Sequence, residues 1–142
     1  MKTAEQLTDL RGLNADELTK RAGEAKGKIV LFDHATTNLI VHNRVARAFD
    51  GIVVTDSSRN LVNANAVDQV VRFGIRVAHD STANRFSRNA VSRALLGLYI
   101  YGGAIGNSFF TTSFSHNYEN VRVRADAPRN AVRPVPSRSE FR

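Results

Sequence analysis

One short pattern, written three times, constrains this 142-residue chain more than any other feature. In each copy a glycine leads through a mainly apolar run to an aspartate: Gly27 to Asp33, Gly51 to Asp56, and Gly74 to Asp80. The first two runs are almost wholly apolar and do not alternate, which is typical of parallel strands covered on both faces. Small polar residues and an apolar segment with helical periodicity follow each aspartate. The pattern therefore predicts a strand, a helix cap and a helix in each copy.

Three such units predict an α/β fold. We expect a small three-layer body in which helices cover a short parallel sheet, with strands near residues 28–32, 52–55 and 75–78. Each aspartate stands where a helix N-cap is required, because its side-chain oxygen can accept a hydrogen bond from a free backbone amide of the first turn. Capping therefore explains the three aspartates without a bound ligand.

A solenoid is the alternative that the repeat leaves open. The aspartates recur after 23 and 24 residues, a period within the range of solenoid repeats. A leucine-rich solenoid requires a fixed frame of leucine and asparagine in each repeat. Asn38, Asn60 and Asn84 match that frame only approximately, so we favour the α/β body.

The two ends of the chain differ from the middle. Capping-box spacing at Thr3 and at Asn14 predicts two short N-terminal helices, which belong to a body spanning residues 1–106. Residues 107–125 alternate around a turn-like segment and predict a β-hairpin. Residues 126–142 contain three prolines and several arginines, which favour an extended arm over a helix or sheet.

The net charge of +7 is confined to the second half of the chain. Residues 1–71 hold nine basic and nine acidic side chains, whereas residues 72–142 hold eleven arginines and four acidic residues. An arginine excess of this kind predicts an anionic partner. The expected contact residues are Arg85, Arg88, Arg93, Arg122, Arg124, Arg129, Arg133, Arg138 and Arg142.

No catalytic signature accompanies this charge. The chain has no cysteine, and its four histidines show no metal-ligand spacing. We therefore expect no catalytic residue, no metal and no cofactor. The alternative is a Mg²⁺ site formed by Asp33, Asp56 and Asp80, because the carboxyl ends of parallel strands meet at one edge of a sheet.

These features favour a non-enzymatic structural or assembly subunit of a virion or nucleoprotein, whose basic C-terminal arm contacts neighbouring subunits or nucleic acid. The alternatives are a stand-alone nucleic-acid-binding protein and a small Mg²⁺-dependent α/β enzyme that uses the aspartate edge. The N-terminus lacks the apolar core of a signal peptide, and no apolar run is long enough to span a membrane. We therefore expect a protein of the cytoplasm or of a virion, with no membrane partner.

Overall fold

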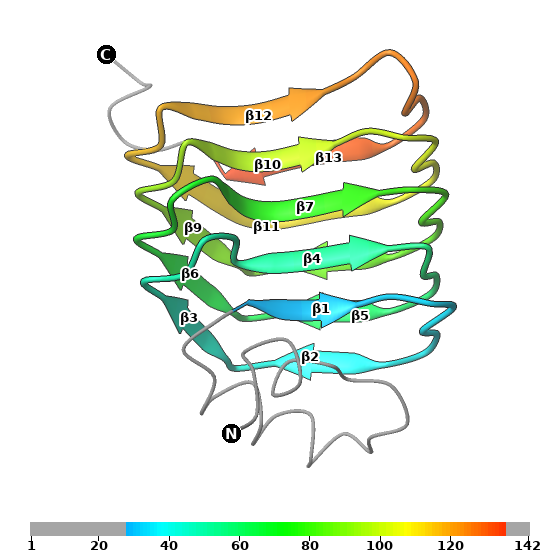
Figure 1. Ribbon diagram of the computed structural model, residues 1–142, viewed down its shortest axis with the longest axis horizontal. Helices are drawn as coiled ribbons and strands as arrows, with labels where there is room; N and C mark the ends of the chain where they lie inside the picture. The colour runs from blue at the N-terminus through cyan, green and yellow to red at the C-terminus, as the bar shows by residue number, and fades with distance from the viewer. Residues whose placement is uncertain (1–27, 136–142) are drawn as a thin grey trace.

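The computed structural model describes residues 28–135. All the regular secondary structure in that range is β-strand. The strands wind into a β-solenoid whose coils are stacked along one axis (Figure 1). The first three coils contain three strands each, the fourth contains two, and the fifth contains two. In chain order they are β1 (Ile29–Leu31), β2 (Leu39–Val41), β3 (Arg44–Ala46), β4 (Ile52–Thr55), β5 (Leu61–Asn63), β6 (Ala66–Asp68), β7 (Phe73–Ala78), β8 (Arg85–Ser87), β9 (Ala90–Ser92), β10 (Leu96–Ile100), β11 (Ser108–Ser115), β12 (Glu119–Val123) and β13 (Ala131–Val135).

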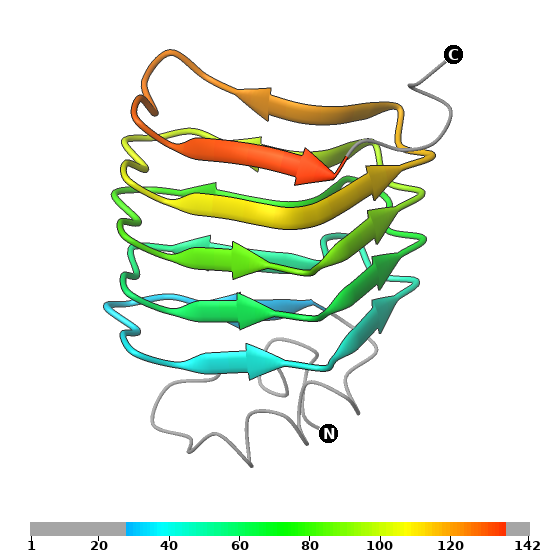
Figure 2. The ribbon, with the colours of Figure 1, turned by 180° about the vertical axis from the view of Figure 1, so that it is seen from behind.

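Three faces surround the core, and all strand pairs are parallel. The front sheet has the order β1-β4-β7-β10-β12. The second sheet bends around β11, whose first residues pair with β8 and whose last residues pair with β9. We call β2, β5, β8, the first half of β11 and β13 the rear face, and β3, β6, β9 and the second half of β11 the side face. Figure 2 shows the rear face from outside the molecule.

Apolar side chains from the three faces meet in columns along the axis. In the front sheet Ile29 pairs with Ile52, and Ile52 pairs with Ile75, each step being 23 residues. All three are fully buried. On the rear face, Phe86 and Phe109 stack with their ring centroids 4.2 Å apart. Like residues on successive coils thus build one continuous core, as in other repeat proteins.

Two ladders of buried asparagines line the inner corners of the coils. In the longer ladder, each Nδ2 donates to the Oδ1 of the asparagine on the next coil, at distances of 2.9 to 3.0 Å. The shorter ladder joins Asn43, Asn65 and Asn89 in the same way. The members of the longer ladder are Asn38, Asn60, Asn84, Asn107 and Asn130. These bonds satisfy amide groups that would otherwise be buried without partners.

The helices expected over the sheet are absent from residues 28–135, so the α/β prediction is wrong. The apolar segments after each aspartate are pairs of short strands separated by a corner, as in β2 and β3. Val45 and Phe49 are four positions apart, which is a helical spacing, but in the structure Val45 is buried whereas Phe49 is 58% exposed. Asp33 and Asp56 occupy the left-handed region, with φ of 55° and 48°, so they form turns and do not cap helices.

The expected hairpin and arm are wrong as well. β11 and β12 belong to different sheets, because β12 pairs with β10 while β11 pairs with β8, β9 and β13. β13 lies within the segment predicted to be an extended arm. β13 includes Pro134. Proline is tolerated in an edge strand, and within the described residues β13 pairs only with β11. The helices predicted from Thr3 and Asn14 lie outside the described residues.

Candidate ligand-binding surface

The rear face carries exposed arginines and one exposed aromatic ring. Arg85 lies in β8 and Arg133 in β13, and both side chains are exposed. The backbone register places Phe110 of β11 between Ser87 and Arg133. Phe110 is 39% exposed. Arg88 occupies the corner that follows β8, and its backbone N–H donates to the Phe110 carbonyl at 3.2 Å.

Two further arginines flank the rear face at the preceding corner. Arg59 and Arg129 both adopt left-handed backbone conformations, with φ of 56° and 61°, and both are exposed. The five arginines of the rear face and its corners, which we call the rear arginine set, are Arg59, Arg85, Arg88, Arg129 and Arg133. Within residues 28–135, no side-chain hydrogen bond or ion pair engages any of them, and no acidic residue lies in β2, β5, β8 or β13.

The other predicted arginines lie on different faces and are paired. Arg93, on the side face, forms a bidentate ion pair with Asp68. Arg122 pairs with Glu119 on the front sheet, where Arg124 also donates to the Tyr99 hydroxyl at 3.4 Å. Arg138 and Arg142 lie outside the described residues. The structure thus brings together Arg85, Arg88, Arg129 and Arg133 and separates the rest.

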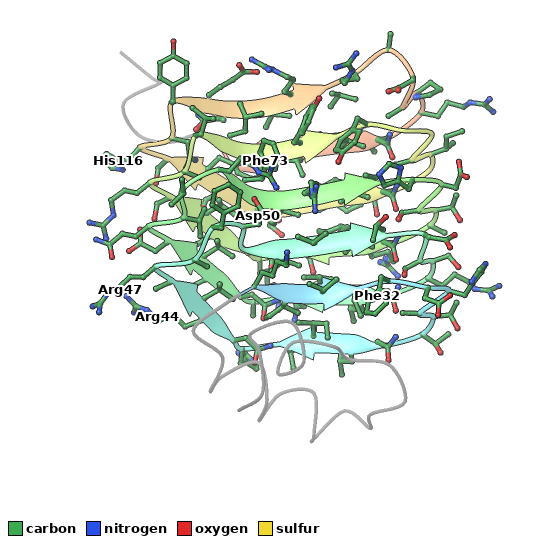
Figure 3. The ribbon with its side chains drawn as sticks, viewed as in Figure 1. Phe32, Arg44, Arg47, Asp50, Phe73 and His116 are labelled. Atoms are coloured by element: carbon green, nitrogen blue, oxygen red, sulfur yellow. The ribbon has the colours of Figure 1, made fainter. Side chains whose placement is uncertain are left out.

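A buried carboxylate, which sequence reasoning missed, lies over the front sheet. Asp50 is 1% exposed and accepts hydrogen bonds from the Arg72 guanidinium at 2.8 and 3.1 Å. The Arg72 guanidinium lies between the rings of Phe49 and Phe73, at 4.6 and 4.5 Å from their centroids. Figure 3 shows Asp50, just before β4, near Phe73 at the start of β7.

The charge of Asp50 is fully compensated. Burial acts to raise the pKa of its carboxyl, but the hydrogen bonds from Arg72 and from the Phe73 N–H, with the charges of Arg72 and Arg76, outweigh it and hold the pKa below its ordinary value. Arg76 in turn donates to the Tyr101 hydroxyl at 3.2 Å. The Arg76 Nη2 lies 3.9 Å from Asp50 Oδ2, whereas its buried Nε has no hydrogen-bond partner among the described residues. The Asp50–Arg72 ion pair acts as a structural brace between coils. The only sequence signal for this ion pair is that an aspartate and an arginine stand 22 residues apart, close to the repeat length.

A shallow pocket of about 310 Å³ lies at the edge of the side face, lined by Ser92, Arg93, Ser115 and His116. Figure 3 places His116 high on this edge and Arg47 lower on the same edge. Asp68 lies beneath the pocket and accepts hydrogen bonds from Arg93 and from the Ser92 hydroxyl, the latter at 2.8 Å. Ser92 therefore donates directly to a carboxylate, and within the described residues no histidine activates it as a nucleophile.

We expect the Asp68 ion pair to make stability depend on pH in the acid range. The Arg93 hydrogen bond lowers the pKa of Asp68 from 3.8 to about 2. The ion pair stabilises the fold fully at pH values above the pKa of Asp68 in the unfolded protein. This stabilisation is lost as the pH falls through the pKa of Asp68 in the folded protein, because below that pH Asp68 is protonated in both the folded and the unfolded state. Denaturant unfolding should show wild type more stable than Asp68→Asn by about 1 kcal/mol at neutral pH, a small value because Arg93 is exposed. This difference should vanish near pH 2; a difference that is constant with pH would contradict it.

The aspartates predicted as an alternative metal site lie along one edge, but only Asp33 and Asp56 are in register; His79 is aligned with them on the third coil and Asp80 follows it. Asp33 and Asp56 follow the paired strands β1 and β4, and Asp80 follows β7. The His34 Nδ1 lies 3.5 Å from Asp33 Oδ1 and 3.7 Å from Asp56 Oδ2. Within residues 28–135, no group of three histidine, cysteine, aspartate or glutamate side chains is arranged to hold a metal ion.

A family model described as "Periplasmic copper-binding protein (NosD)" matches residues 14–132, which is most of the chain. The chain belongs to the NosD family. The comparison with curated proteins found no match, and neither did the comparison with solved structures. In the described part of the chain, no helix is long and apolar enough to cross a membrane.

Membership of the NosD family corrects several predictions. The family is described as periplasmic and copper-binding, so the expected virion or nucleoprotein subunit is wrong. The predicted partners, namely copies of the chain, other assembly subunits and nucleic acid, are wrong for the same reason, as is the expected location in the cytoplasm or a virion. Charge and the lack of catalytic motifs could not reveal this, because neither property specifies a compartment.

The cysteine, methionine and histidine content of this chain does not fit a copper site of the kind that the family description names. Copper(I) prefers thiolate and thioether ligands, and copper(II) is well suited to imidazole. The chain has no cysteine and one methionine, Met1. All four histidines lie within residues 28–135, where no three-ligand group is found.

Proposed function

We propose that this chain is a non-enzymatic binding domain that holds an acidic polysaccharide against its rear face. The observation that carries the proposal is the rear arginine set: five guanidinium groups without acidic partners among the described residues, two in strands of the rear face and three at its corners. A guanidinium presents paired N–H donors that match a carboxylate or sulfate. Uronate and sulfated sugars carry such groups at regular intervals.

The spacing of the face supports an extended ligand. Neighbouring strands lie about 4.8 Å apart, so equivalent side chains on successive coils form regular rows. Arg85 in β8 and Arg133 in β13 lie two coils apart and on either side of β11. Phe110 of β11 is the register partner of Arg133, and Arg85 is aligned two positions earlier, with Ser108. The exposed ring of Phe110 therefore offers an apolar surface beside Arg133 on which the less polar face of a sugar can rest.

An acidic polysaccharide fits this surface better than a lipid bilayer does. Membrane-surface binding requires a broad apolar face that enters the interface, together with basic residues. On the rear face, exposed large apolar side chains are limited to Phe110 and Leu61 within the described residues, at 39% and 37%. The periplasmic description of the family also favours a glycan over a nucleic acid.

Binding to immobilised heparin and to polygalacturonate tests the proposal, with neutral dextran as a negative control. The triple variant R85A/R88A/R133A should bind about 30-fold or more weakly than wild type, because three charge-assisted contacts are removed. Wild-type affinity should also fall steeply as salt is added, since the contacts are solvent-exposed.

The matched control is R93A/R122A/R124A, which also removes three arginines, all of them away from the rear face. Its affinity should stay close to that of wild type. Equal binding by the two sets of variants would contradict the proposal, because binding would then reflect net charge alone. Binding to anionic vesicles but not to either polysaccharide would show that the rear face recognises a membrane surface instead.

A further inference from the structure

We infer that the solenoid of this chain keeps the NosD fold without a copper centre. The inference is independent of the proposed function, because it concerns other residues and another ligand. It rests on where the fold places the four histidines, which are the only imidazole ligands in the sequence.

Two of the histidines stand far from the others, at separate corners of the coils. His42 lies between β2 and β3, in a left-handed conformation with φ of 57°. His116 follows β11 and lines a pocket with Arg93 and two serines. A guanidinium beside this imidazole repels a cation, and the Asp68 carboxylate beneath it is already engaged by Arg93.

The remaining two histidines share the acidic edge but lie on different coils. His34 belongs to the first coil and His79 to the third. Continuing the register of β1, β4 and β7 places Asp33, Asp56 and His79 in one column, so the second coil contributes a carboxylate between the two histidines. Residues two coils apart are separated by about 10 Å along the axis.

The contacts made by these two histidines are not those of a copper ligand set. His34 Nδ1 is 3.5 and 3.7 Å from its two carboxylate oxygens, which is the spacing of an ion pair. His79 packs edge-on against the Tyr101 ring, with their centroids 5.6 Å apart. Within residues 28–135, His34 and its two neighbouring carboxylates are not arranged as a three-ligand group, so they do not supply a copper site.

Copper retention tests the inference directly. The full chain is loaded with Cu(II), and in parallel with Cu(I) under reducing conditions, then passed over a chelating resin and assayed for metal. We expect wild type, His34→Gln and His79→Gln to emerge equally copper-free. Electron paramagnetic resonance during Cu(II) loading should show no spectrum with several nitrogen ligands.

Asp56→His is the matched gain-of-function variant. The Asp56 carboxylate lies next to His34 and in the same column as His79, so this substitution adds an imidazole on the coil between the two histidines. The variant should retain copper that wild type releases. If wild type retains one copper ion per chain after the resin, in either oxidation state, the inference is overturned. This holds whichever histidine substitution lowers the copper content.

Discussion

Replacing Asn84 by alanine is expected to lower the free energy of unfolding by about 3 to 5 kcal/mol. The Asn84 side chain accepts hydrogen bonds from the backbone N–H and the Nδ2 of Asn60, and donates to Asn107 Oδ1 and to the Ser57 carbonyl. All four bonds are 2.9 to 3.0 Å long and buried. Alanine removes the side chain but leaves its partners without compensation in the interior. Equilibrium denaturation in urea measures the loss.

Asn38→Ala is the control for this prediction, because it truncates the same residue type at the end of the ladder. The Asn38 Nδ2 donates to Asn60 Oδ1 at 3.0 Å, and the residue is only partly buried. Its loss should cost about 1 kcal/mol, the net value of an ordinary hydrogen bond. Equal destabilisation by the two variants would show that the ladder does not depend on its buried interior members.

Gly74→Ala is expected to cost about 3 kcal/mol or to prevent folding, because overpacking a closed site displaces the backbone. A Cβ at this position would lie 2.2 Å from Val91 Cγ1 and 2.7 Å from the Gly97 carbonyl oxygen. The side chain of Val91 is itself in the core, and the carbonyl belongs to the next coil. Neither can move without disturbing its neighbours. Gly51 is similarly confined, by Val67 and by the Gly74 carbonyl.

Gly106→Ala separates steric overlap from backbone strain. A Cβ at Gly106 would meet nothing within 4 Å, but its φ is +73°. The cost should therefore be about 1 to 2 kcal/mol, from the left-handed conformation alone. Thermal or urea unfolding of both variants gives the comparison. Gly74→Ala as mild as Gly106→Ala would mean that adjacent coils can separate to admit a methyl group.

The sequence revealed the repeat but not what the repeat builds. The three glycine-led runs coincide with β1, β4 and β7, yet the fold class constructed on them was wrong. Val45 and Phe49 have the four-residue spacing of one helix face, but a strand and a corner place only Val45 in the core. The asparagines carried the missing signal, because Asn60, Asn84 and Asn107 recur at the same point of successive coils.

The candidate surface was predicted only in part. Arg85, Arg88 and Arg93 were predicted to contact the same anionic partner, but the chain bends between β8 and β9. The bend leaves Arg85 and Arg88 with the rear face and turns Arg93 towards Asp68 on the side face. The brace between Asp50 and Arg72 was not foreseeable, since it joins different coils and depends on the register of the solenoid.

The corners differ in their number of residues from coil to coil, and this shows where such a chain can gain or lose residues. Front-sheet partners are always 23 residues apart, yet Leu39 and Leu61 are separated by 22 residues and Leu61 and Arg85 by 24. Insertions and deletions of one residue are thus tolerated at the corners. Inside a strand, the same change would move every following side chain of that strand to the opposite face of the sheet. New loops, including binding loops, can therefore be grafted at the bends while the interior stays as it is.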